Sequence, residues 1–111
     1  MFKLFSREPK GYQDVEPHEV QEALQKQKAA QLVDVRSKGE YAQGHLPGAK
    51  LIPVHDLKVR ARSLRPDEPV ILYCLSGARS ASAARFLAAE GFQDVRNMKG
   101  GIRRWNGEIV R

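Results

Sequence analysis

The sequence predicts an α/β fold in which a parallel sheet is covered by helices on both faces. Residues 32–35 and 69–73 form short, mainly apolar runs, which are typical of strands buried on both sides. These runs alternate along the chain with stretches in which apolar residues have helical spacing. Such helices carry the chain back across the sheet, so we expect neighbouring strands to run parallel.

Length and composition limit the chain to one compact domain. With 111 residues, 41% hydrophobic and 29% charged, it has the composition of a globular domain and is too short for two. We expect residues 11–111 to form this domain and residues 1–10 to be a short N-terminal extension. The single cysteine, Cys74, excludes an intramolecular disulfide and any zinc site that needs two or more cysteines.

The first half of the chain predicts one helix and two strands. The helix begins near Glu16, has Pro17 in its first turn and continues to about Ala29. Its apolar face is formed by Val20, Ala23 and Leu24. Residues 32–35 predict a buried parallel strand and residues 50–52 a second, shorter one. The loop between these strands is marked by Gly44, Pro47 and Gly48.

The strongest strand signal is the β-branched and aromatic run at residues 69–73, which continues directly into Cys74. An alanine-rich helix is expected at residues 79–90, and Gly91 ends it. Ligands of an open parallel sheet bind outside the carboxyl ends of its strands, where loops lead into helices. Cys74 lies at a position of that kind.

The end of the chain predicts a last strand and a short helix. Residues 94–98 have the composition of a strand. Gly100 and Gly101 follow as a turn, and residues 102–105 begin the last helix. This strand completes the alternation of strands and helices on which the fold class rests.

The sequence has no feature of a membrane or secreted protein. No apolar run approaches the roughly 20 residues that a bilayer core requires. The first seven residues lack both the apolar stretch and the cleavage site of a secretory signal. We therefore expect a cytoplasmic protein without a membrane partner.

The net charge of +6 is compatible with anionic small molecules, nucleic acid or an acidic protein partner. The densest group of cations, here called the basic group, consists of Lys58, Arg60, Arg62 and Arg65. No aromatic residues are interleaved with it, as a base-stacking surface would need, so no nucleic-acid partner is expected. Its simplest interpretation is a solvated face, and an acidic protein partner is the alternative.

The loop after the predicted strand at residues 69–73 has the composition of an anion-binding site. Backbone N–H groups and the positive end of the next helix are expected to converge on the Cys74 sulfur and favour its thiolate, with Arg79 as the neighbouring cation. Gly77 permits a left-handed or closely approaching backbone, and the small Ser76 and Ala78 leave the loop open. The predicted cradle around the nucleophile comprises Leu75, Ser76, Gly77, Ala78, Arg79 and Ser80.

Cys74 and Ser80 can each also be interpreted as residues with a purely structural role. A cysteine beside a strand is commonly an inert core residue. The loop argues against this role for Cys74, because an inert cysteine needs no cradle of small residues and arginine. Ser80 has its own alternative, as a residue of the helix N-terminus that satisfies a backbone donor.

Three segments of the chain resemble the rhodanese domain. The first resembles that family's first signature and consists of Asp34, Val35, Arg36, Glu40, Tyr41, residues 44–49, Ile52 and Pro53. The second resembles the active-site loop and its helix, and consists of residues 74–80 with Ala83, Ala84 and Leu87. The third consists of Val95, Gly100, Gly101 and Trp105. The resemblance covers residues 12–107, with the three segments in the family's order and spacing.

The resemblance implies a three-layer fold with a five-stranded parallel sheet, and the activity of a thiosulfate sulfurtransferase. Thiosulfate or a related persulfide would give its outer sulfur to the Cys74 thiolate, and cyanide or a thiol would then remove it from the Cys74 persulfide. The loop N–H groups from Leu75 to Ser80 would stabilise the charged outer sulfur. Neither a metal nor an organic cofactor is implied, and both a monomer and a homodimer are compatible with the sequence.

Other functions remain open for the same loop. The domain can relay sulfur from one protein to another, or it can be a non-catalytic binding module. Phosphatases and arsenate reductases related to rhodanese have five residues between cysteine and arginine. Here four residues separate Cys74 from Arg79, and the tighter loop fits a single sulfur atom better than a phosphoryl group.

The natural sulfur donor is open as well. Tandem-domain rhodaneses specialised for thiosulfate carry cationic side chains just after the cysteine, where this chain has Leu75 and Ser76. A loop that ends on arginine resembles the single-domain bacterial members instead. The donor can therefore also be a protein persulfide, a polysulfide or glutathione persulfide.

Four residues outside the loop are expected to support it. Asp34, at the end of a strand, is placed to bond the loop, and Arg36 and Glu40, four residues apart, are expected to form an ion pair. His45 is expected to bond a loop, because a preformed thiolate needs no general base. Three more residues are expected at the surface or in the packing of the last helix: His18, His55 and Trp105.

Overall fold

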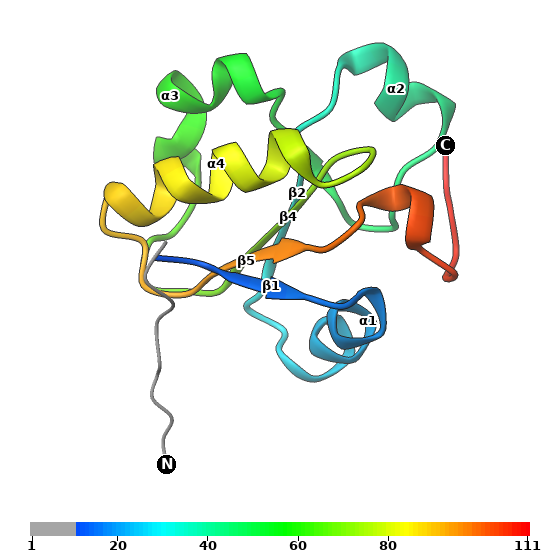
Figure 1. Ribbon diagram of the computed structural model, residues 1–111, viewed down its shortest axis with the longest axis horizontal. Coiled ribbons are helices and arrows are strands. Elements are labelled where there is room, and N and C mark those ends of the chain that lie inside the picture. The colour runs from blue at the N-terminus through cyan, green and yellow to red at the C-terminus, as the bar shows by residue number, and fades with distance from the viewer. Residues whose placement is uncertain (1–10) are drawn as a thin grey trace.

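The computed structural model describes residues 11–111 and contains one five-stranded sheet between layers of helices (Figure 1). The order across the sheet is β1-β5-β4-β2-β3, and every adjacent pair is parallel. The strands are β1 (Gln13–Val15), β2 (Gln31–Asp34), β3 (Lys50–Leu51), β4 (Val70–Tyr73) and β5 (Val95–Met98). This sheet confirms the predicted α/β class. The extension expected at residues 1–10 lies outside the described residues.

Two hydrophobic clusters cover the two faces of the sheet. On one face, Val70 and Leu72 of β4 pack with side chains from α3 (Leu57–Arg60) and α4 (Ala78–Ala89). On the other face, Ile71 and Tyr73 pack with side chains from α1 (Pro17–Lys26). Figure 1 shows α3 and α4 on one side of the strands and α1 on the other. Because both faces of β4 are covered, the strand needs apolar residues at every position.

Three short elements were not predicted: β1, α2 (Lys38–Gln43) and α3. β1 has three residues and pairs with β5, which lies more than eighty residues away along the chain. Helix α2 has Ser37 as its N-cap, and the Ser37 side chain accepts a hydrogen bond from the Glu40 backbone N–H. The Glu40 carboxylate accepts one from the Ser37 backbone in return, which completes a capping box.

The remaining helices differ from the predictions at their ends. α1 ends at Lys26 instead of Ala29, because Gln27 leaves the helical conformation with φ −111° and ψ 89°. The unpredicted α3 is flanked by the 3₁₀ turns η1 (Val54–Asp56) and η2 (Ala61–Ser63), which were not predicted either. The last helix is a single 3₁₀ turn, η3 (Ile102–Arg104). Within residues 11–111, no helix has the length and apolar character needed to cross a bilayer.

The parallel arrangement brings three chain segments together at the carboxyl ends of the strands, here called the carboxyl edge of the sheet. Cys74 follows β4, Arg36 lies just beyond β2, and Gly101 lies just beyond β5. Since β4 lies between β2 and β5, Cys74 stands at the centre of this edge.

Candidate active site

The Cys74 sulfur lies inside a loop that directs hydrogen-bond donors at it. The backbone N–H of Gly77 donates to Sγ at 3.1 Å, and the backbone N–H and hydroxyl of Ser80 each lie 3.4 Å from it. Gly77, with φ 110°, precedes the first residue of α4, so the N-terminus of this twelve-residue helix also faces the sulfur. Cys74 itself is 1% exposed. The loop therefore forms a small cradle that favours negative charge on sulfur.

The electrostatic balance of Cys74 favours the thiolate. Burial raises the pKa of its thiol, because a charged sulfur loses hydration. The hydroxyl of Ser80 and the backbone N–H groups of Ser80, Gly77 and Ser76 lower this pKa by more, and the pKa of Cys74 falls below its ordinary value. Hydrogen bonds to the charged form thus outweigh the effect of burial on the Cys74 pKa.

The start of the loop rests on the turn after β5. The backbone N–H of Ile102 donates to the Cys74 carbonyl at 2.9 Å, and that of Arg103 donates to the Leu75 carbonyl at 3.2 Å. Gly101, with φ 67°, lies against the same carbonyls, and a side-chain carbon there would overlap them. The sequence placed Gly101 in a turn and in the third segment that resembles the rhodanese domain. Neither observation predicted this contact, because a contact between two loops is not visible in local sequence.

A buried polar side chain on β5 also reaches the loop. The Ser80 hydroxyl lies 2.5 Å from Oδ1 of Asn97, and Nδ2 of Asn97 donates to the Asp14 carboxylate at 3.0 Å. Asn97 is 3% exposed and Ser80 is fully buried. Sequence reasoning missed Asn97, although a polar residue in a predicted strand of a sheet covered on both faces was a usable signal.

The guanidinium of Arg79 is held by a carboxylate and not by the Cys74 sulfur. Its Nη1 and Nη2 donate to the two oxygens of Glu40 at 2.8 and 3.0 Å. These bonds raise the pKa of Arg79, and together with the bonds from Ser37 they lower the pKa of Glu40 to about 2. The pair joins α4 to α2 at the rim of the loop.

The predicted ion pair between Arg36 and Glu40 is wrong. Arg36 precedes Ser37, the cap of α2, so it is not one turn from Glu40 on the same helix. Its guanidinium instead binds both oxygens of Asp34, with a shortest distance of 2.8 Å, and donates to the Gly44 carbonyl at 2.7 Å. Asp34 also accepts a hydrogen bond from the Arg36 backbone. The expected bond between Asp34 and the active-site loop is therefore wrong, because Arg36 occupies both oxygens of this carboxylate.

His45 lies at the end of α2 and is used in packing. Its Nδ1 donates to the Tyr41 carbonyl at 2.9 Å, and its ring stacks on the Tyr41 ring with centroids 3.6 Å apart. Its backbone pairs with Val110 and so anchors the end of the described chain. His18 and His55 are exposed, as expected.

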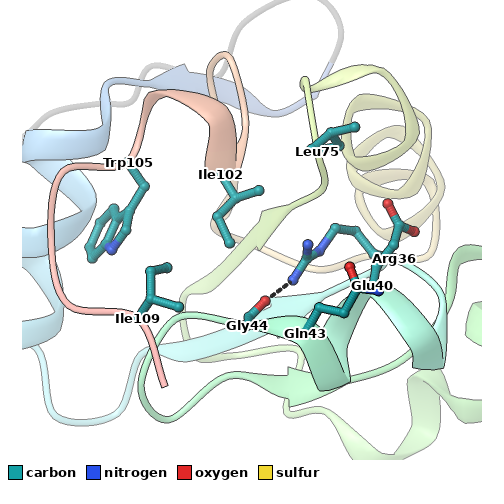
Figure 2. A pocket seen from close by; sticks show the side chains of 8 residues that line it. All are labelled: Arg36, Glu40, Gln43, Gly44, Leu75, Ile102, Trp105 and Ile109. Atoms are coloured by element: carbon teal, nitrogen blue, oxygen red, sulfur yellow. Dashed lines mark hydrogen bonds between the residues drawn. The ribbon is translucent and has the colours of Figure 1, made fainter. Parts of the chain in front are cut away.

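A cavity of about 450 Å³ opens beside the loop (Figure 2). One wall is apolar and is formed by Leu75, Ile102, Trp105 and Ile109. The opposite wall is polar and is formed by Arg36, Glu40, Gln43 and Gly44. Glu40, which binds Arg79 at the rim of the loop, is also part of the cavity wall. A molecule in the cavity therefore lies next to the active-site loop.

Trp105 and the basic group lie outside the cradle itself. Trp105 is partly buried against the cluster on the α1 face, and its indole N–H donates to the Glu108 carbonyl at 3.0 Å. All four members of the basic group are exposed, and they lie on and after α3. In residues 11–111, no group of three or more metal-ligating side chains comes together.

A buried cysteine in a loop of hydrogen-bond donors, at the carboxyl ends of parallel strands, is the arrangement expected of a cysteine-dependent enzyme of the α/β class. The family model of the rhodanese-like domain matches residues 16–108. The chain belongs to the rhodanese-like domain family, as its three segments predicted.

Similar proteins agree with this assignment. The chain is 45% identical to protein YqhL of Bacillus subtilis over 72% of this chain and 64% of that protein. It is 42% identical to a sulfurtransferase of Allochromatium vinosum (67% of this chain, 69% of that protein) and 38% identical to the thiosulfate sulfurtransferase GlpE of Pseudomonas fluorescens (80% and 81%). A rhodanese-like domain protein from Staphylococcus aureus superimposes with a TM-score of 0.79 at 34% identity, over 86% of this chain and 93% of that one. These relatives confirm the predicted class, a rhodanese-type sulfurtransferase.

Proposed function

We propose that Cys74 carries a sulfane sulfur as a persulfide. The thiolate attacks the outer sulfur of a donor, the donor's S–S bond breaks, and the leaving group takes the bonding electron pair. With thiosulfate the leaving group is sulfite, and the negative charge of Cys74 passes to the outer sulfur of the persulfide. The observation that carries this proposal is the convergence of the Gly77 and Ser80 donors on Sγ.

The donor we propose is a small sulfur-bearing anion, either thiosulfate or a persulfide. The loop is short, and the N–H groups that surround Sγ suit one additional sulfur atom better than a tetrahedral phosphoryl group. The formal charge of +6 aids the approach of such anions. The residues of the cradle are Leu75, Ser76, Gly77, Ala78, Arg79 and Ser80.

The acceptor must come from outside the chain, because Cys74 is its only cysteine. A thiol acceptor needs a place for its organic part, and the cavity beside Leu75 offers an apolar wall for it. The same cavity suits a cysteine on a protein donor or acceptor. A sulfur relay between proteins is therefore the second function that we propose.

We assign structural roles to the four residues outside the loop. The buried pair of Asp34 and Arg36 fixes the end of β2 to the Gly44 carbonyl. Glu40 holds Arg79, and His45 holds the end of α2. None of these roles requires a general base, because the cradle already favours the Cys74 thiolate.

We propose that the reaction takes place in a reducing compartment. A lone thiol nucleophile fits the cytoplasm, and the chemistry requires no metal or organic cofactor. Residues 11–111 contain the whole proposed site, so a monomer can perform the reaction, and a homodimer is compatible with it. The basic group is proposed as a solvated face that binds no nucleic acid.

Intact-mass measurement after incubation with thiosulfate tests the proposal. Wild type should gain the mass of one sulfur atom, and Cys74→Ser should gain none. Addition of cyanide should restore the original mass and release thiocyanate. If wild type remains unmodified with thiosulfate, polysulfide and glutathione persulfide, the persulfide mechanism is wrong.

A second measurement separates the enzyme from the relay. Turnover with thiosulfate and cyanide is compared with the rate at which a cysteine desulfurase passes its persulfide to Cys74. Fast turnover with small molecules supports the enzyme, whereas slow turnover together with fast transfer from the protein supports the relay.

A further inference from the structure

The Ser80 hydroxyl has one hydrogen and three acceptors within reach. Its Oγ lies 2.5 Å from Oδ1 of Asn97, 3.4 Å from Sγ of Cys74 and 3.3 Å from the Gly77 carbonyl oxygen. A hydroxyl donates only one hydrogen bond at a time. The bond to sulfur and the bond to Asn97 therefore exclude each other.

Asp14 determines which end of the Asn97 amide faces Ser80. The Asp14 carboxylate is an acceptor only, so the amide nitrogen of Asn97 must face it, and their distance is 3.0 Å. This orientation turns Oδ1 toward Ser80. Asn97 is 3% exposed and Ser80 is fully buried, so bulk water does not compete for the same hydrogen.

We propose that Asn97 is a positioning residue of the sulfur-transfer reaction, whose side-chain oxygen competes with the Cys74 sulfur for the single hydrogen of Ser80. This inference rests on the function proposed above for Cys74. It assigns Asn97 to the reaction although the residue has no contact with the sulfur. Its effect passes entirely through the Ser80 hydroxyl.

The competition matches the movement of charge in the reaction. In the thiolate, Sγ is charged and attracts the Ser80 hydrogen. When the outer sulfur of thiosulfate is transferred and sulfite leaves with its electron pair, the negative charge moves to the outer sulfur of the persulfide. Sγ is then neutral and a weaker acceptor. Asn97 receives the hydrogen at that stage, so the persulfide forms without leaving the buried hydroxyl unsatisfied.

Titration of the thiolate by its absorbance near 240 nm tests the proposal, because Cys74 is the only thiol in the chain. Asn97→Leu removes the nearest competing acceptor at similar volume and leaves only the Gly77 carbonyl beside the sulfur, so Ser80 donates to sulfur for a larger share of the time. We expect the Cys74 pKa to fall by about half to one unit, which is about a three- to tenfold gain in thiolate at a given pH below it. Ser80→Ala removes the donor and should raise this pKa.

The two substitutions together identify the route of the effect. Asn97→Leu should have no effect on the Cys74 pKa in the Ser80→Ala background, since the hydrogen is absent. The charged groups around the loop are the same in all variants, so they cannot produce this pattern. These groups are Arg79, Glu40, Arg36, Asp34 and Asp14. If Asn97→Leu does not fold, Asn97→Ala is titrated with the same expectation.

A merely structural role for Asn97 predicts the opposite result. Loss of the loop geometry would remove donors from Sγ and would raise the Cys74 pKa toward that of a free cysteine. An unchanged or raised pKa in the folded Asn97 variant overturns the proposal. So does a lowered pKa that persists without Ser80.

The rate of persulfide formation gives a second readout. At a pH where Cys74 is fully ionised, Asn97→Leu should react about two- to threefold more slowly with thiosulfate, because a more stabilised thiolate is a weaker nucleophile. A rate equal to or above that of wild type contradicts the proposal. Failure of the proposed function would appear differently, as a wild type that takes up no sulfur while the titrations still shift.

Discussion

Arg79 of the active-site loop and Glu40 of α2 form a two-point ion pair, with distances of 2.8 and 3.0 Å between guanidinium nitrogens and carboxylate oxygens. The pair connects two elements that flank the carboxyl edge of the sheet and balances the charge of the loop's only arginine. The pKa of Cys74 is therefore lowered by the hydrogen bonds from Ser80, Gly77 and Ser76, while Arg79 is held by Glu40 at the rim of the loop.

Glu40→Gln should strengthen the binding of anionic donors. Glutamine keeps the capping box with Ser37 but leaves the charge of Arg79 unbalanced beside the loop. We expect the KM for thiosulfate to fall by about two- to fivefold, as is usual for one partly exposed charge. Steady-state kinetics at low ionic strength measures this, and the difference should diminish with added salt. A raised KM would instead assign Glu40 to the orientation of Arg79.

The Glu40–Arg79 pair should also make stability depend on pH. The pKa of Glu40 is about 2 in the folded protein against an ordinary value of 4.5. A lowered folded-state pKa stabilises the protein above the unfolded-state pKa, and this contribution is lost as the pH falls through the folded-state value. Urea unfolding should therefore show wild type more stable than Glu40→Gln above about pH 5, by at most about 1 kcal/mol since both groups are partly exposed. The two curves should converge toward pH 2, and a constant difference would contradict this origin.

Sulfur uptake should follow the ionisation of Cys74. Hydrogen bonds from Ser80 and Gly77 lower the pKa of this thiol, so the rate of persulfide formation should rise with pH and level off earlier than for a free cysteine. Rapid-mixing experiments with thiosulfate over a pH series measure the midpoint. The expected midpoint lies below about 8.5, the value of a free thiol, and a midpoint above it would mean that burial outweighs the donors.

Gly101→Ala should disrupt the active-site loop. A side-chain carbon at this position would overlap the Cys74 and Leu75 carbonyls, and φ is 67°. We expect a loss of stability of at least about 1–3 kcal/mol together with a large loss of sulfur uptake. Gly48→Ala is the matched control, because φ is 81° there but no atom lies within 4 Å. The control should lose some stability and keep its activity, and equal activity losses in both variants would contradict the role of the contact.

Ile109→Asp should discriminate between acceptors. Ile109 is 44% exposed and belongs to the apolar wall of the cavity, so a carboxylate there disfavours the organic part of an acceptor thiol. The KM for an apolar thiol should rise severalfold, about the effect of losing one apolar contact, while that for cyanide stays the same. Val59→Asp, at a 68% exposed position on α3, should change neither. An equal effect on both acceptors would place the thiol elsewhere.

The sequence predicted those elements whose residues show a strong local pattern. β4 is apolar at every position and α4 has a clear apolar face, so both were located within one residue. β1 escaped because its three residues carry no pattern of burial and become a strand only by pairing with β5. α2 escaped because six residues held by a capping box have no buried face.

The site was predictable to the extent that it is local. Cys74 and the small residues of its loop are adjacent in sequence, and their chemistry could be inferred directly. The partners of Arg36 and Arg79 are set by how α2 meets the loop, which no spacing rule contains. Asn97 and Gly101 reach the loop from β5 and the turn after it, so only the order of the strands reveals them.

The central position of β4 determines how the nucleophile behaves as the protein is heated. β4 is hydrogen-bonded on both sides, to β2 and to β5, and all its side chains are buried. Backbone amides of such a strand exchange with deuterium only when the whole domain opens. Cys74 is attached to the end of this strand. Its sulfur should therefore keep its environment almost to the melting temperature and lose it in the same cooperative transition that unfolds the sheet.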